Sequence, residues 1–210
     1  MSASFRTVLA ATACAALLAT TSACTDEPEA KKAAPSPSPS PSATTAAPEP
    51  VGPPLKVVVT RVSGKLPKKA RPALEANVGR AISGYVRNAF LLGEYPRSSF
   101  GRAFSTFSTG AAREARRRDE GLLTNRWLGP TTESVRVRRQ TAYLSVLAPH
   151  KVAAGVTARV EFVFAVDRGE RPTQRVRLAG RLMLTRKNSG GWQIFGYDLA
   201  RSNTPVGSGS

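Results

Sequence analysis

The chain has 210 residues, with 31 Lys and Arg against 14 Asp and Glu, so its formal net charge is +17 at pH 7. It has one histidine and two cysteines, Cys14 and Cys24, which excludes a disulfide framework and a metal centre of the Cys/His kind. The length beyond residue 55 suits one domain with a single core.

The first residues are typical of an export signal. One cation, Arg6, precedes a charge-free run that ends at Cys24, and Thr25-Asp26-Glu27 restores polarity. The run consists mainly of Ala and Thr, and no cluster of Lys or Arg follows it. This pattern favours a cleaved signal peptide over residues 1–23 rather than a membrane-spanning helix.

The three residues before Cys24, Thr21-Ser22-Ala23, are all small. The stretch resembles the lipobox of bacterial lipoprotein precursors, although that family usually has Leu where Thr21 stands here. The resemblance implies that Cys24 receives a diacylglyceryl group and that the mature chain is acylated. It would then be anchored at the outer face of the cytoplasmic membrane. The alternative is ordinary cleavage after Ala23, which would leave an unmodified cysteine.

Residues 24–54 follow as a Pro/Ser-rich segment. PSPSPSPS at 35–42 disfavours both helix and sheet, because each proline lacks a backbone donor and pushes its neighbour toward extended geometry. We therefore expect a disordered tether over 24–54, a folded domain over 55–201 and a disordered tail over 202–210.

The domain begins with LKVVVTRV at 55–62, a predicted strand that either joins a sheet edge or only leads in from the tether. A helix is expected from about Pro72, because apolar residues recur at three- and four-residue spacings as far as Phe90. Phe100, Phe104 and Phe107 predict a short second helix. A third is expected to begin after Ser108 or Thr109 and to run toward Arg118.

After Glu133 the hydrophobic period changes to two, which predicts strands. They are expected at 134–147, 156–166, 176–184 and 192–200, and the first has a phase slip around Arg139 and Gln140 that indicates a bulge. The pattern predicts an α+β domain, with about three N-terminal helices packed on one face of a curved antiparallel sheet of about four long strands.

The order of elements over 67–200 and the closing GGWQIFGYDLA resemble the nuclear transport factor 2-like, or cystatin-like, superfamily of the exported actinobacterial type. The resemblance implies a cone-like fold. It also implies an alternative function, because members include isomerases and cyclases that use Asp, His or Tyr inside the cone.

Candidates for such chemistry are few. His150 lies in the APHK turn and is expected at the surface. Tyr197 and Asp198 are neighbours on the last strand and point to opposite sides of it, so one of them should face the cone. The interpretation favoured here is that Tyr197 packs in the core and Asp198 pairs with an arginine. We therefore expect a non-catalytic domain that uses no metal and no cofactor.

Charge is the strongest positive feature. Twenty-eight of the Lys and Arg and ten of the Asp and Glu lie from Leu55 onward. Six arginines fall in the outward phase of neighbouring strands: Arg136, Arg138, Arg159, Arg175, Arg177 and Arg181. They form either a solvated face or a surface for polyanions.

An exported, anchored protein meets anionic phospholipid, wall polymer or acidic envelope proteins rather than nucleic acid. The sequence therefore predicts an accessory binding protein of the cell envelope, which is attached to its own cytoplasmic membrane through the lipid. The alternative is a small-molecule-binding or isomerase-like protein that uses a cone cavity. The pattern of residues indicates no oligomeric state.

Overall fold

The structure is a computed structural model that describes residues 52–207. The expected signal peptide, Cys24 and nearly all of the expected tether lie outside these residues. The described chain belongs to one compact unit, Ala46–Ser210. All residues of its buried core lie between Leu74 and Leu199, so this unit carries its complete core and is expected to fold by itself.

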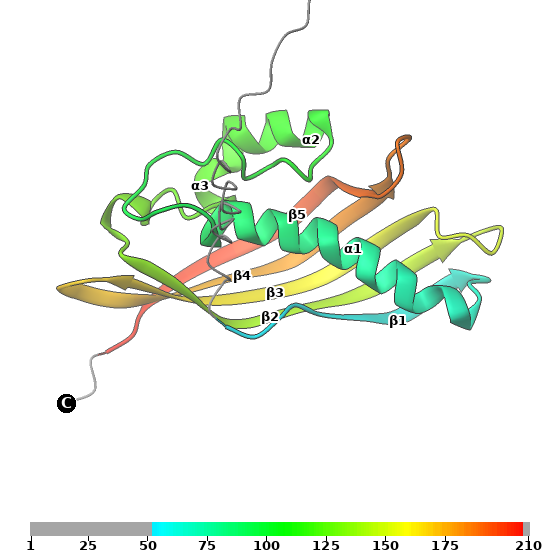
Figure 1. The fold of residues 1–210 in the computed structure, drawn as a ribbon, viewed down its shortest axis with the longest axis horizontal. Coiled ribbons are helices and arrows are strands. Elements are labelled where there is room, and N and C mark those ends of the chain that lie inside the picture. Colours follow the sequence, from blue (N-terminus) through cyan, green and yellow to red (C-terminus); the bar gives the residue numbers. More distant parts are fainter. Residues whose placement is uncertain (1–51, 208–210) are drawn as a thin grey trace, which may run out of the picture. The chain divides into compact units, whose positions relative to one another are not determined.

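A five-stranded sheet forms the base of the domain (Figure 1). Its order follows the chain: β1 (Lys56–Gly64), β2 (Ser134–Ala148), β3 (Gly155–Arg168), β4 (Arg171–Arg186) and β5 (Trp192–Pro205). The strands from β2 to β5 pair antiparallel, whereas β1 pairs parallel to β2. Apolar residues alternate along β3 and β4, and one face of these strands is buried.

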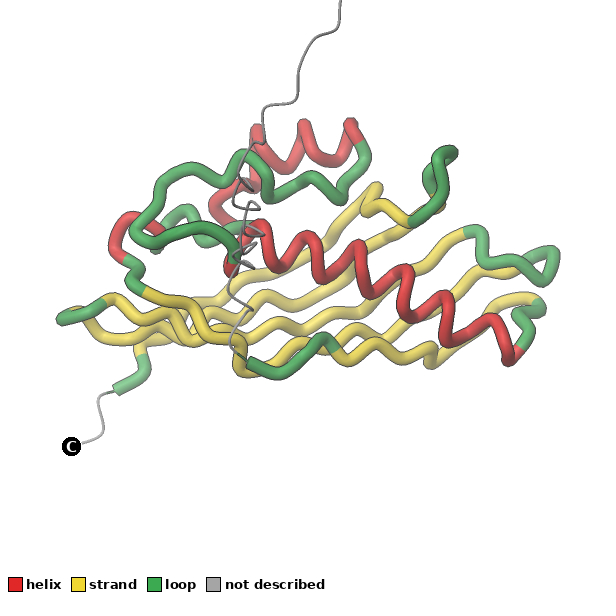
Figure 2. Tube along the Cα trace, viewed as in Figure 1, coloured by secondary structure: helices red, strands yellow, loops and turns green. Residues whose placement is uncertain are grey.

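Two helical segments cover one face of the sheet (Figures 1 and 2). The first is α1 (Arg71–Val86), extended by a 3₁₀ turn at Lys68–Ala70 and a π-helical turn at Arg87–Leu91. The second joins α2 (Thr109–Glu114), a π-helical turn at Ala115–Asp119 and α3 (Glu120–Leu123). Pro72 lies in the first turn of α1, where its missing donor costs nothing, and the Ser108 hydroxyl caps α2.

Aromatic rings fill the space between the helices and the sheet. Phe90 stacks on Phe164 of β3 with ring centroids 4.5 Å apart. Tyr85 packs edge to face against Phe107 and donates a 2.7 Å hydrogen bond to the carbonyl of Leu123. Burial raises the pKa of the Tyr85 phenol, so this group stays protonated and keeps its donor. The two helical segments are thus tied together within the core.

The expectation of three helices is wrong, because residues 52–207 form two helical segments, of about 24 and 15 residues, besides a 3₁₀ turn at Gly129–Thr131. The segment from Phe100 to Phe107 is a series of turns with backbone bonds between residues three apart. Such turns place every third residue on one side, so the phenylalanine spacing does not distinguish them from a helix. The end of the segment then bridges to Ile194 of β5.

The expectation of about four antiparallel strands is also wrong, because the sheet has five strands and is mixed. The first strand joins the sheet edge, and the helical segments provide the long connection that a parallel pair requires. The carboxylate of Glu75 on α1 accepts a 2.7 Å hydrogen bond from the backbone N–H of Val59. This bond satisfies one donor of a strand that lies at the sheet edge.

Two local features differ from simple strands. The register of β2 against β3 shifts between Val137 and Arg139, which is a bulge one residue before the predicted position. At the other end of the domain, β5 continues past Ala200 to Pro205 and pairs with β4, so the expected tail begins as strand. Both features bring additional residues to the face of the sheet that the helices leave open.

Candidate anion-binding face

The open face of the sheet carries the outward side chains of β2, β3 and β4. Each strand buries every second residue under the helices, so its other residues point away from them. Nine exposed arginines lie on these strands, and no lysine does. Two of them, Arg171 and Arg186, lie at the two ends of β4. We call the other seven the arginine face: Arg136, Arg138, Arg139, Arg159, Arg175, Arg177 and Arg181.

The structure places all six arginines singled out in the sequence on this face and adds Arg139. The bulge explains the addition, because an extra residue in β2 leaves two consecutive arginines, Arg138 and Arg139, exposed. The phase slip in the sequence was the available signal, but it did not show on which side Arg139 would lie. The cross-strand register sets Arg159 directly opposite Arg181, an arrangement of like charges that needs compensation.

Two carboxylates neutralise part of the face. Glu161 accepts a hydrogen bond from Nε of Arg177 at 2.8 Å and another from Nη1 of Arg139 at 3.3 Å. Asp198 accepts bonds from Nε and Nη2 of Arg181 at 3.2 and 2.7 Å. The hydrogen bond from Arg177 is the largest cause that lowers the pKa of Glu161, and the bond from Arg139 adds to it. Glu161 is therefore ionised at neutral pH and holds the two arginines together.

Four arginines of the face have no carboxylate within 4 Å among residues 52–207: Arg136, Arg138, Arg159 and Arg175. The guanidinium of Arg159 lies over the ring of Tyr143, 5.8 Å from its centroid, which orients it without neutralising its charge. The face thus holds a clear excess of positive charge, and no side chain within the described part of the chain occupies the hydrogen-bonding groups of Arg138 and Arg175, from which an anion could accept hydrogen bonds.

Two adjoining hollows lie along β3 on this face. The first, of about 550 Å³, is lined by four arginines, Arg138, Arg139, Arg175 and Arg177, and is bounded by Thr173 and Val206. Val163 and Ala165 form its floor, and they leave room because their side chains are short. The second, of about 410 Å³, contains Tyr143 and Arg159 and shares Arg177 with the first. The C-terminal contribution of Val206 had no signal in the sequence.

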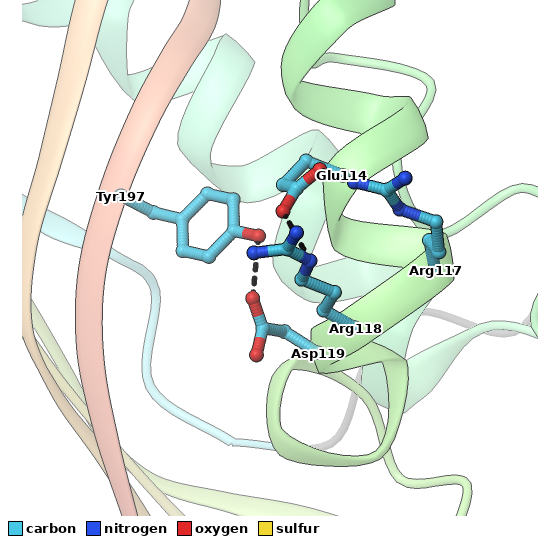
Figure 3. A network of polar contacts seen from close by, with 5 residues as sticks. All are labelled: Glu114, Arg117, Arg118, Asp119 and Tyr197. Carbon is cyan, nitrogen blue, oxygen red and sulfur yellow. Dashed lines mark hydrogen bonds and ion pairs between the residues drawn. The ribbon is translucent and has the colours of Figure 1, made fainter.

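The two minority catalytic candidates lie on opposite faces of β5. Asp198 is exposed and pairs with Arg181 on the arginine face. Tyr197 points toward the second helical segment and donates a 2.8 Å hydrogen bond to Oδ2 of Asp119 (Figure 3). Desolvation is the largest cause that raises the pKa of Tyr197, and the bond to Asp119 raises it further. The phenol is therefore protonated at neutral pH and acts here as a donor.

The arginines near the end of the second helical segment are also partly paired. Glu114 accepts a 2.7 Å hydrogen bond from Arg117 and forms an ion pair with Arg118 at 2.8 Å (Figure 3). All three side chains are at least 40% exposed, so these pairs contribute little to stability. They line none of the hollows described above. His150 is exposed in the turn between β2 and β3, distant in sequence from Glu114 and its two arginines.

A partly buried cation, Arg201, ties β5 to the second helical segment. Nη1 of Arg201 donates to the carbonyls of Gly121, at 3.0 Å, and of Thr124. Its guanidinium lies 5.5 Å from the ring centroid of Trp127. Desolvation by burial lowers the pKa of Arg201 to about 10, so the group is still charged at neutral pH. We assign it a structural role, because carbonyl oxygens at the helical segment accept its bonds.

Over residues 52–207, no group of three His, Cys, Asp or Glu side chains is placed to hold a metal ion. No helix within the same range is long and apolar enough to cross a membrane. The chain matches no protein-family model, no curated protein and no solved structure. The lipobox at Cys24, which lies outside the described residues, and the superfamily resemblance therefore stay predictions.

Proposed function

We propose that the chain is an extracytoplasmic lipoprotein, anchored through Cys24, whose domain binds anionic partners of the cell envelope through the arginine face. One observation carries the proposal: Arg138 and Arg175, which have no carboxylate partner among residues 52–207, line a hollow on the open face of the sheet. Guanidinium groups in this situation can give bidentate hydrogen bonds to phosphate or carboxylate. The expected role is accessory binding without catalysis.

The geometry around Tyr197 and Asp198 gives the enzyme alternative no comparable support. Both side chains already have partners, Asp119 and Arg181, and they lie on opposite faces of the sheet. A general acid or base pair needs two groups that reach the same substrate. The positions of Tyr197 and Asp198 therefore support the proposed binding function better than an enzymatic one.

The test uses the compact unit from Ala46 to Ser210. At low salt it is titrated with polyanions, namely polyphosphate and polyglutamate, and with vesicles of phosphatidylglycerol or of neutral phosphatidylcholine. We expect binding to at least one anionic probe, none to the neutral vesicles, and a steep loss of affinity as salt is raised. If every anionic probe fails to bind at low salt, the proposed function is wrong.

A further inference from the structure

The two hollows of the arginine face adjoin along one strand. The floor of the first is formed by Val163 and Ala165, and that of the second includes the outward residues Arg159 and Glu161. From Ala165 to Arg159, β3 rises by about 20 Å at its usual rise per residue. Arg177 lines both hollows. Together the two hollows form one track along the middle of the sheet. The track is long enough for several anionic groups of one linear molecule and longer than a single small ion needs.

The walls of the track indicate the chemistry of its occupant. Arginines line it on both sides, from β2 at Arg138 and from β4 at Arg175, and their planar groups match the oxygens of a phosphate. The floor of the first hollow offers few hydrogen-bonding side chains, because Val163 and Ala165 form it. A peptide would bring backbone amides that need partners, whereas a short aliphatic spacer between phosphates would not.

The shape of the track also distinguishes a polymer from a membrane surface. A flat layer of headgroups is contacted by side chains that project, whereas Arg138 and Arg175 flank a hollow. Hydroxyl groups of Thr173 and Thr141 lie at the rims of the two hollows and could bond to hydroxyls of a polyol. Tyr143 adds an apolar surface at the far end, already partly covered by Arg159.

We propose that the track binds a flexible linear polymer in which phosphodiester groups are joined by short polyol spacers, as in an anionic wall polymer. This inference rests on the proposed function and narrows it to one class of ligand. Arg138 and Arg175 hold one phosphate in the first hollow, and Arg159 holds a later phosphate in the second. Because both phosphates belong to one polymer molecule, affinity depends on the length of that polymer.

The experiment compares probes that carry the same total phosphate. The unit from Ala46 to Ser210 is titrated with poly(glycerol phosphate) of about ten units and, separately, with glycerol 3-phosphate. Because the polymer can make contacts in both hollows, it should bind at least about 100-fold more tightly per phosphate than glycerol 3-phosphate. Polyglutamate of equal charge, phosphatidylglycerol vesicles and a single-stranded oligonucleotide of equal phosphate number complete the set. The expected order places poly(glycerol phosphate) first.

Two double variants locate the site. Arg138→Gln with Arg175→Gln should weaken polymer binding by at least about tenfold, because charged hydrogen bonds to phosphate are lost. Lys69→Gln with Arg113→Gln removes the same charge from exposed residues of the two helical segments and should change affinity by less than about threefold. Thermal unfolding of both variants checks that the fold is kept.

Each other outcome is decisive. Equal losses in the two double variants would show that net charge alone attracts the polymer, which overturns the track and the arginine face as the site but keeps the binding of anionic partners by the domain. Tighter binding of polyglutamate, vesicles or the oligonucleotide would overturn the polyol-phosphate assignment and keep the proposed function. No binding of any anionic probe would overturn both.

Discussion

Glu161 is the residue on which the balance of the arginine face depends. Its side chain is 28% exposed, and it pairs with two arginines that are 63% and 52% exposed. Ion pairs of this exposure are worth at most about 1 kcal/mol each. Their main effect is on anion binding. Glu161 occupies hydrogen-bonding groups of Arg139 and Arg177, which line the first hollow, so these groups are not available to an incoming anion.

Glu161→Gln should therefore strengthen polyanion binding while reducing stability only slightly. The change removes one negative charge and releases two guanidinium groups, so affinity for polyphosphate should rise about threefold to tenfold at low salt. The exposed Glu170, which forms no ion pair within the described chain, gives a matched control in Glu170→Gln. Fluorescence titration at neutral pH measures the difference, and an unchanged or lowered affinity in Glu161→Gln would contradict the prediction.

The lowered pKa of Glu161 gives this pair a defined pH dependence. A depressed folded-state pKa means that the stabilisation is fully present above the pKa of an unfolded Glu, about 4.3, and is lost as pH falls through the lower folded value. The difference in unfolding free energy between the wild type and Glu161→Gln should thus be constant near neutrality and shrink below about pH 4.

At the scale of elements, the junction of β4 with β5 depends on a glycine. Gly180 has φ of +143°, a conformation that other residues rarely adopt, and a Cβ there would overlap the carbonyl of Asp198. That Cβ would also lie 3.0 Å from Cα of Leu199. The two strands approach so closely here that β4 can accept no side chain at this position.

Gly180→Ala should accordingly destabilise the domain by more than about 3 kcal/mol, since backbone strain and steric overlap add. Gly190→Ala is the control, because Gly190 also has a positive φ, +87°, but a Cβ added there, in the turn before β5, would meet no atom within 4 Å. Gly190→Ala should lower the free energy of unfolding by about 1–2 kcal/mol, because only the strain of the positive φ applies there. Chemical denaturation measures the free energy of unfolding of both variants. Equal losses would show that the approach of β4 and β5 at Gly180 is not tight.

Most strands could be predicted from the sequence, because one face of the sheet is buried and the alternation in β3 and β4 is regular. The parallel pairing of β1 could not, since LKVVVTRV gives a strand without giving its partner or direction. The helix predicted around Phe104 failed because turns reproduce its spacing. The outward arginines followed from alternation, but the first hollow is lined both by short side chains such as Ala165 and by Val206, which follows the last strand.

On the scale of the whole molecule, the chain reaches the domain beside the first hollow. The carbonyl of Pro53 accepts a 2.7 Å hydrogen bond from Nε2 of Gln140, next to the bulge that carries Arg138 and Arg139. The predicted tether to Cys24 therefore joins the domain close to the arginine face. An anchor and a basic face on one chain would act together, because the first attachment raises the effective concentration for the second.

The anchor itself is tested through the two cysteines. If Cys24 is acylated, protein extracted from membranes should have an intact mass that fits a chain beginning at Cys24 with added acyl groups, since more than one chain is needed for firm attachment. Cys24→Ala should abolish this mass and membrane retention, whereas Cys14→Ala, within the predicted signal, should leave both unchanged. An unmodified Cys24 in protein recovered from the medium would contradict anchoring and remove the reason to expect partners at the membrane and wall.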